Sequence, residues 1–206
     1  MEPFNEKGFI LFIFYSFLGW SWETIKCSAE NRRFINRGFF KGPYCPIYGC
    51  GALIINEVLS NTDNTVMLFF GGAMLCTTLE YTTSLILEML FHKRWWDYSS
   101  SRFNLKGRIC LLCSTSFGVL SVLLIKFVQP LMDKLMASIP ANCIHYIFMV
   151  SFLVYLADNL YTFYNMTGNI RKAFGYRLKN ALNTSPFSTE MAVRISEKMF
   201  GGNEDE

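Results

Sequence analysis

The sequence predicts an all-α protein, a polytopic transmembrane helix bundle with about five spanning helices. Hydrophobic residues make up 51% of the 206 residues. Charged residues make up 17%, against about 25% in an ordinary soluble domain. The apolar residues gather in five long segments, and the lysines and arginines gather in alternate connections between them. A soluble core of this length could not bury so much apolar side chain, so a membrane protein is the favoured class.

All five apolar segments lack the strict alternation of a β-strand, so helices are favoured over a barrel. Most of the segments reach the roughly 20 residues that a spanning helix needs. The second is short and rich in glycine at its start, which suits a tilted or partly re-entrant helix. The predicted helices cover about residues 8–29, 46–60, 65–91, 107–128 and 142–166.

Two domains follow from these segments. Residues 1–166 are predicted to form the transmembrane bundle, and residues 167–206 a cytoplasmic tail. Within the tail, residues 170–182 suit an amphipathic helix whose basic side chains lie near anionic lipid. The first apolar run has the length of a signal peptide, but no basic residues dominate before it and it continues to Glu23. We therefore expect it to be a spanning helix.

The basic residues predict the orientation of the chain. Sixteen of the nineteen lysines and arginines fall after the first helix, after the third helix or in the tail. The other three are Lys7, Lys126 and Lys134, which fall on the opposite side of the predicted bundle. Cytoplasmic segments of membrane proteins carry an excess of lysine and arginine. The N-terminus is therefore predicted to lie outside and the C-terminus in the cytoplasm.

The third apolar segment contains two acidic residues, Glu80 and Glu88. Residues four apart lie on one face of a helix, so Ser84 and His92 share a polar column with the two acids. A charge left in hydrocarbon costs about 2.5 to 3.5 kcal/mol on insertion scales. The column is therefore expected to face other protein or a wet cavity.

The first and fifth helices carry acids at a similar predicted depth, Glu23 and Asp158. Small residues near Glu23 allow close helix approach, and hydrogen-bonding residues surround Asp158. These faces predict a polar cavity that opens to the cytoplasm, where carboxylates could bind a cation or exchange protons. The candidate residues are Glu23, Glu80, Ser84, Glu88 and Asp158.

Basic residues next to glycines suggest a second kind of site at the inner face. In residues 32–51 a basic arm precedes a Gly/Pro turn and a helix start, and residues 104–108 repeat that order. Backbone N–H groups at a helix start, together with guanidinium groups, suit a phosphate or carboxylate such as a lipid headgroup. An equally good explanation is that the basic residues set the orientation of the chain in the membrane and that the glycines allow the helices to pack closely. The candidate residues are Arg37, Gly49, Gly51, Arg94 and Arg108.

The seven cysteines lie mostly inside apolar runs and are expected to be unpaired hydrophobic residues. Cys110 and Cys113 form a C-x-x-C, but no second pair or nearby histidine completes a metal site. We therefore expect no metal and no cofactor. Trp95, Trp96 and Tyr98 fall where an inner aromatic belt is expected.

Six motifs in residues 14–118 together resemble the Putative ABC-transporter type IV family of bacterial membrane proteins. This resemblance implies a small permease-like protein of the bacterial plasma membrane. The chain has no Walker A pattern, so any use of ATP would need a separate ATPase subunit. The motifs are Gly19-x-x-x-Glu23, Asn36-Arg37-Gly38-Phe39, Gly42-Pro43-x-Cys45-Pro46-Ile47-Tyr48-Gly49-x-Gly51, Leu79-Glu80-Tyr81-x-Thr83-Ser84-x-x-x-Glu88, Arg94-Trp95-Trp96-Asp97-Tyr98 and Phe103-Asn104-x-x-Gly107-Arg108-Ile109.

Three functions stay open at this point. The first is a transport component in the lipid bilayer with a polar inward-facing site. The second is an intramembrane enzyme or lipid-binding protein acting on a phosphate-bearing lipid. The sequence has no nucleophile motif that would support an enzyme. The third is a structural membrane subunit in which Glu80 or Glu88 pairs with an arginine of the inner loops. None of the three involves nucleic acid, and a homo-oligomer is compatible with each.

Overall fold

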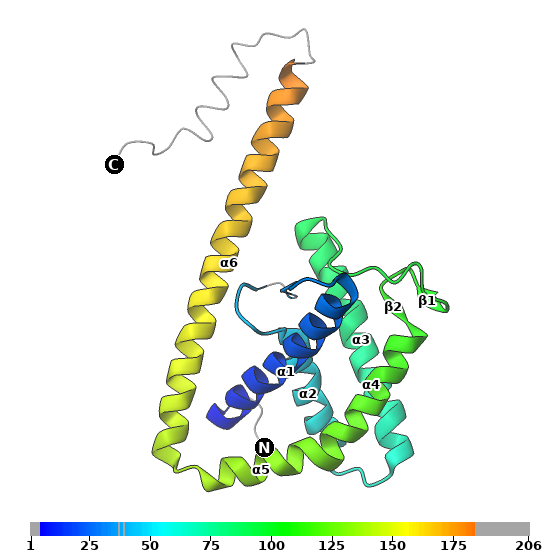
Figure 1. The fold of residues 1–206 in the computed structure, drawn as a ribbon, viewed down its shortest axis with the longest axis vertical. Helices are drawn as coiled ribbons and strands as arrows, with labels where there is room; N and C mark the ends of the chain where they lie inside the picture. The colour runs from blue at the N-terminus through cyan, green and yellow to red at the C-terminus, as the bar shows by residue number, and fades with distance from the viewer. Residues whose placement is uncertain (1–4, 37, 39, 184–206) are drawn as a thin grey trace. The chain divides into compact units, whose positions relative to one another are not determined.

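The computed structural model describes residues 5–36, 38 and 40–183, with side chains as far as residue 165. The chain divides into two units, Met1–Leu156 and Ala157–Glu206, and each is described by itself. The elements in chain order are α1 (Glu6–Asn31), α2 (Pro46–Leu59), α3 (Thr65–Phe91), β1 (Asn104–Leu105), β2 (Ile109–Cys110), α4 (Leu111–Leu123), the π-helical turn η1 (Leu124–Val128), α5 (Gln129–Ser138) and α6 (Ala141–Asn183) (Figure 1).

The predicted all-α class is confirmed. Since α4, η1 and α5 are continuous, the described part of the chain contains five helical segments. The short β1–β2 hairpin was not predicted, and it occupies the start of the predicted fourth helix. Lys106 and Gly107 have φ values of 53° and 69°, which a right-handed helix does not allow. The fourth helix therefore begins at Leu111 instead of Gly107.

Local chemistry explains where several helices begin and end. Asn5 and Asn64 are the N-caps of α1 and α3, and their side chains accept hydrogen bonds from backbone N–H groups of the first turn. Arg32 and His92 end the same two helices in the left-handed conformation. His92 is therefore the cap that terminates α3, and its N–H donates to the Glu88 carbonyl at 2.9 Å.

Glycines allow close approach of α1 and α2. A Cβ atom at Gly49 would lie 2.6 Å from the carbonyl oxygen of Phe12 and would also overlap the Ser16 hydroxyl. On the opposite helix, a Cβ at Gly19 would overlap the Tyr48 ring. The two helices therefore pack backbone to backbone, as small residues permit in membrane bundles.

A similar contact joins α3 to α4. A Cβ atom at Gly72 of α3 would overlap the side chain of Ser121, which is fully buried. A Cβ at Gly118 of α4 would lie 2.7 Å from the Phe69 ring. Since α2 also contacts α3, the helices are arranged in space in the order α1, α2, α3, α4.

The helical segment after α4, made of η1 and α5, is tied to α1 by a polar contact. Figure 1 shows α5 leaving the end of α4 in a new direction. The Tyr15 hydroxyl donates to Gln129 Oε1 at 2.7 Å, and Gln129 Nε2 donates to Asp133 at 2.9 Å. Both Tyr15 and Gln129 are buried, so this contact positions α5 against α1.

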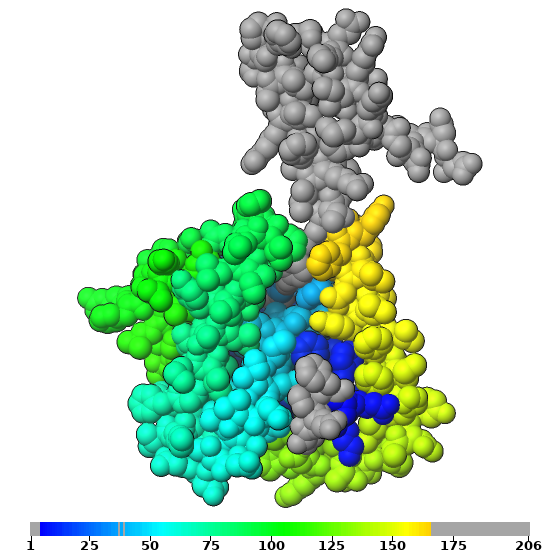
Figure 2. All heavy atoms as spheres, turned by 180° about the vertical axis from the view of Figure 1, so that it is seen from behind, coloured from blue at the N-terminus to red at the C-terminus, as the bar shows by residue number. Residues whose placement is uncertain are grey.

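The outer surface of the helices is strongly apolar. In the space-filling view α2 and α3 form a broad face (cyan to green, Figure 2), and Val66, Met67, Phe70 and Met74 of α3 are exposed on the helix surface. Three helices are long and apolar enough to cross a membrane: Glu6–Asn31, Leu111–Ser138 and Ala141–Asn165. The predicted five spans are thus supported for three segments, while α2 is a shorter apolar helix and α3 is not among the three.

The Gly72–Ser121 contact predicts a loss of stability on adding one methyl group. Gly72→Ala should lower the thermal unfolding midpoint of the detergent-solubilised protein by several degrees. Overpacking costs about 1–3 kcal/mol, which exceeds the gain of roughly 1 kcal/mol in helix propensity from glycine to alanine. A matched control is Gly51→Ala, where the new Cβ would lie 3.4 Å from Cys76 Sγ, an ordinary contact. Equal midpoints for the two variants would contradict the packing described.

Candidate functional site

The acidic column on α3 is partly buried inside the protein. Glu80 is 7% exposed and Ser84 is also buried, whereas Glu88, one turn further along, is about one-third exposed. All three belong to one continuous helix, as the spacing predicted. The question is therefore which groups face these two carboxylates.

The segment from His92 to Cys110 supplies the partners, since it folds back along the C-terminal half of α3. The Tyr98 hydroxyl donates to Glu80 Oε1 at 3.0 Å. Burial raises the pKa of the Tyr98 phenol above its ordinary value, with the Glu80 carboxylate adding to the effect. Tyr98 therefore keeps its proton and acts as the hydrogen-bond donor to Glu80.

Two arginines of the same segment face Glu88. Arg108 Nη2 lies 2.6 Å from Glu88 Oε2, and Arg94 Nε lies 3.2 Å from Glu88 Oε1. Arg108 also donates to the Ser84 hydroxyl at 3.1 Å and stands over the Tyr81 ring. Because Arg108 is only 9% exposed, its charge depends on Glu88 for neutralisation.

A tight turn of the hairpin positions Arg108. Lys106 and Gly107 both have positive φ, as the two central residues of a type I′ turn require, and Arg108 N donates to the Leu105 carbonyl at 3.0 Å. The Asn104 side chain accepts from Gly107 N at 2.9 Å. A Cβ at Gly107 would also lie 2.5 Å from Asp97 Oδ1, so glycine is required there for space as well as for φ.

The tryptophan-rich stretch before the hairpin contributes to this folded-back segment. Trp96 Nε1 donates to the Arg108 carbonyl at 3.0 Å, and Tyr98 N donates to the Gly107 carbonyl at 2.8 Å. Hydrogen bonds from the Ser99 hydroxyl and backbone N–H hold the pKa of Asp97 below its usual range. Trp96 and Tyr98, which were predicted as part of an aromatic belt, thus also hold the loop against α3.

A second acid–phenol pair lies near Glu80. The Tyr48 hydroxyl of α2 donates to Glu23 of α1 at 2.6 Å. Glu23 lies within electrostatic range of Glu80, and Glu80 within range of Tyr48. The other Glu80 oxygen, Oε2, is buried and has no hydrogen-bond partner among the residues that the structure describes. A shared ion-binding role for Glu23 and Glu80 stays a prediction.

The remaining candidate residues have different surroundings. Gly49 faces α1, so close packing accounts for it, and Gly51 makes ordinary contacts with Cys76 and Leu79 of α3. Arg37 lies outside the described residues. Asp158 belongs to the second unit, which is described by itself. The site residues that sequence reasoning missed are Tyr48 and Tyr98, since no motif of the sequence alone pairs a distant tyrosine with a buried acid.

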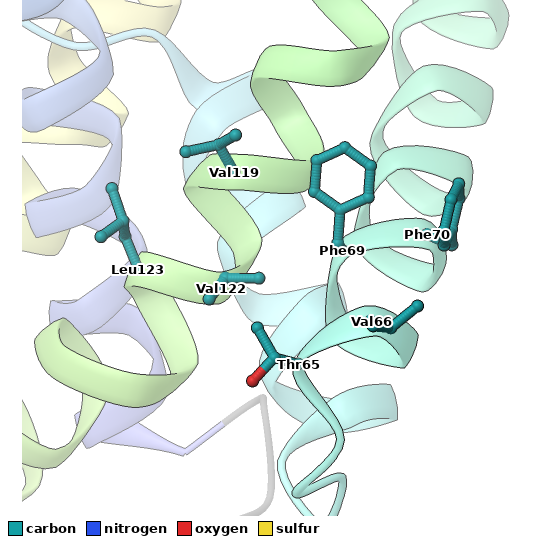
Figure 3. A pocket seen from close by; sticks show the side chains of 7 residues that line it. All are labelled: Thr65, Val66, Phe69, Phe70, Val119, Val122 and Leu123. Atoms are coloured by element: carbon teal, nitrogen blue, oxygen red, sulfur yellow. The ribbon is translucent and has the colours of Figure 1, made fainter.

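The structure also has an apolar groove, which is separate from the acidic column. It has a volume of about 350 Å³ and lies between the first turns of α3 and the end of α4 (Figure 3). Phe69 in its wall is eleven residues from Glu80, or roughly 16 Å along the helix. The groove contains none of the candidate site residues. Its lining residues are Thr65, Val66, Phe69, Phe70, Val119, Val122 and Leu123.

Within the described residues, no group of three or more His, Cys, Asp or Glu side chains is placed to hold a metal ion. The polar contacts of the site are thus made by carboxylates, phenols, guanidiniums and hydroxyls.

Helices of this length and hydropathy, with apolar side chains on their outer surface, define a multi-pass membrane protein. The chain belongs to the family described as Putative ABC-transporter type IV, whose model matches residues 10–163. This confirms the resemblance found in the motifs. No curated protein and no solved structure matches the chain significantly.

The two arginines on Glu88 should differ in their effect on stability. Arg108→Gln should lower the thermal unfolding midpoint by several degrees, because it removes the buried partner of Glu88 and Ser84. Arg94→Gln should change it by at most about 2 °C, because Arg94 is 38% exposed and exposed ion pairs contribute little. Thermal unfolding in detergent measures both, and a larger loss for Arg94→Gln would contradict the assignment.

Proposed function

We propose that the protein is a permease-like transport component of the bacterial plasma membrane, with Glu80 as its proton- or cation-binding group. Membership of the family supports the transport class. The alternation of basic residues along the chain supports an outside N-terminus and a cytoplasmic C-terminus. In this orientation, Glu88 belongs to the inner half of the bundle and Glu80 lies near its middle.

The observation that carries the proposal is the environment of Glu80. Its carboxylate is buried, receives one hydrogen bond from Tyr98, and keeps one oxygen without a partner among the described residues. Ionisable groups buried in membrane proteins are costly, and they commonly mark ion or proton pathways. Glu23 and Tyr48 extend the polar surroundings of Glu80 across α1 and α2.

In this proposal Glu88 has a different role from Glu80. Its two oxygens face Arg94 and Arg108, so it anchors the folded-back segment that carries Tyr98. Arg94 and Arg108, which were proposed for a headgroup site, therefore have Glu88 as a partner within the protein. Transport driven by ATP would use a separate ATPase subunit, since the chain has no Walker A pattern.

The Glu88 ion pairs favour one second candidate, a structural membrane subunit. The guanidinium groups of Arg94 and Arg108 neutralise the charge of Glu88, which would otherwise be costly at this position. In a purely structural subunit Glu80 would likewise serve only to hold Tyr98. Replacing Glu80 with glutamine separates the two functions, because the amide keeps the shape and accepts the phenol hydrogen bond but carries no charge.

Proton uptake into vesicles tests the proposal. The purified protein is reconstituted into liposomes that contain a pH-sensitive dye, and an inside-negative potential is imposed. We expect acidification with the wild type and at least a tenfold lower rate with Glu80→Gln, because the amide cannot take up a proton.

The matched control is Glu57→Gln, which removes an exposed acid of α2 and should leave the rate unchanged. Wild-type rates no faster than protein-free vesicles, or an undiminished rate with Glu80→Gln, would overturn the proton-binding assignment. An undiminished rate combined with loss of a co-purifying partner would favour the structural subunit.

A further inference from the structure

The two cysteines of the C-x-x-C sequence meet at the first turn of α4. Cys110 is the N-cap of the helix, and its Sγ accepts a hydrogen bond from Cys113 N at 3.4 Å. The two sulfur atoms lie 3.2 Å apart, and the Cys110 thiol donates to Cys113 Sγ. Both cysteines are free thiols. Cys110 is 3% exposed, while Cys113 is half-buried, so a reagent would reach Cys113 first.

These thiols are connected to the acidic column. The Cys113 side chain lies beside the Tyr98 hydroxyl, and this hydroxyl donates to Glu80 Oε1. Tyr98 therefore lies between the two thiols and the Glu80 carboxylate.

We propose that Cys110 and Cys113 are a redox-active dithiol that closes to an intramolecular disulfide by exchange with a low-molecular-weight disulfide. Adjacent thiols in C-x-x-C at a helix start are the arrangement that thiol–disulfide oxidoreductases use. The two sulfur atoms are 3.2 Å apart, so only a short movement separates them from bonding distance.

The exchange has two steps. The Cys113 sulfur, as thiolate, attacks one sulfur of the reagent, which breaks the reagent's S–S bond and releases one small thiol. The Cys110 sulfur then attacks Cys113 Sγ, which forms the internal S–S bond and releases the second small thiol. Two electrons pass from the cysteines to the reagent, and the two cysteine protons end on the released thiols.

Closure of the disulfide converts the Cys113 thiol beside the Tyr98 hydroxyl into half of a disulfide. This changes the surroundings of the phenol that donates to Glu80. If Glu80 binds protons during transport, as proposed above, oxidation should change the rate of uptake. This second consequence rests on the proposed function, whereas formation of the disulfide does not.

Peptide mapping tests the site directly. The full-length protein in detergent is equilibrated with increasing ratios of oxidised to reduced glutathione. The exchange is then quenched, the protein is denatured and the free thiols are alkylated. Mass spectrometry of the peptides shows which cysteines carry the alkyl group. We expect Cys110 and Cys113 to lose alkylation together, with their peptide two hydrogen atoms lighter. Cys27 and Cys45, whose side chains are buried away from the reagent, should stay fully alkylated.

Single variants distinguish a dithiol from two independent thiols. Cys110→Ser should trap the mixed disulfide of Cys113 with glutathione, because the resolving thiol is missing. Persistent alkylation of both cysteines at every ratio, or accumulation of the mixed disulfide in the wild type, would overturn the proposal.

The vesicle assay separates this inference from the proposed function. Oxidised and reduced wild type should differ at least twofold in uptake, while the double variant Cys110→Ser/Cys113→Ser should not respond to the reagent. A mapped disulfide without any change in uptake would overturn the link to Glu80 and keep the redox site. Failure of uptake in all forms would count against the transport proposal alone.

Discussion

The structure depends on the polar partners of two carboxylates that α3 carries among apolar helices. Glu88 meets Arg108 at 2.6 Å and Arg94 at 3.2 Å, and Glu80 receives the Tyr98 hydroxyl at 3.0 Å. All three partners come from the segment between α3 and α4. A segment that would otherwise be a simple connection is therefore bound to the face of α3, and its tight turn and hairpin serve to aim Arg108.

The same constraint separates the roles of the two acids. Glu88 has a guanidinium on each oxygen, so its charge is used within the fold. Glu80 has one phenol and a buried oxygen without a partner in the described part of the chain. Tyr98 also lies beside the Cys113 thiol at the start of α4. The proposed ion binding is therefore assigned to Glu80 and not to Glu88, although both were first grouped in one column.

The sequence was sufficient for the helical class and for the column on α3, because a spacing of four and apolar runs are local properties. It did not predict the β1–β2 hairpin, because the sequence there resembles the start of a helix. The hairpin depends on the positive φ of Lys106 and Gly107 in one short turn. It did not pair Tyr98 with Glu80 or Tyr48 with Glu23, because those contacts depend on tertiary packing. For Gly49 the sequence left both an anion site and helix packing open, and its close approach to Ser16 and Phe12 accords with helix packing.

A double-mutant cycle of Tyr98→Phe and Glu80→Ala, each of which removes the hydrogen bond between the two side chains, tests the central claim most directly. Unfolding free energies of the wild type, both single variants and the double variant give the interaction energy between the two side chains. Residues in contact typically couple by about 0.5–3 kcal/mol, and the account predicts a value in this range. Effects that add to within about 0.3 kcal/mol would mean that the folded-back segment does not hold Glu80, and would contradict the account.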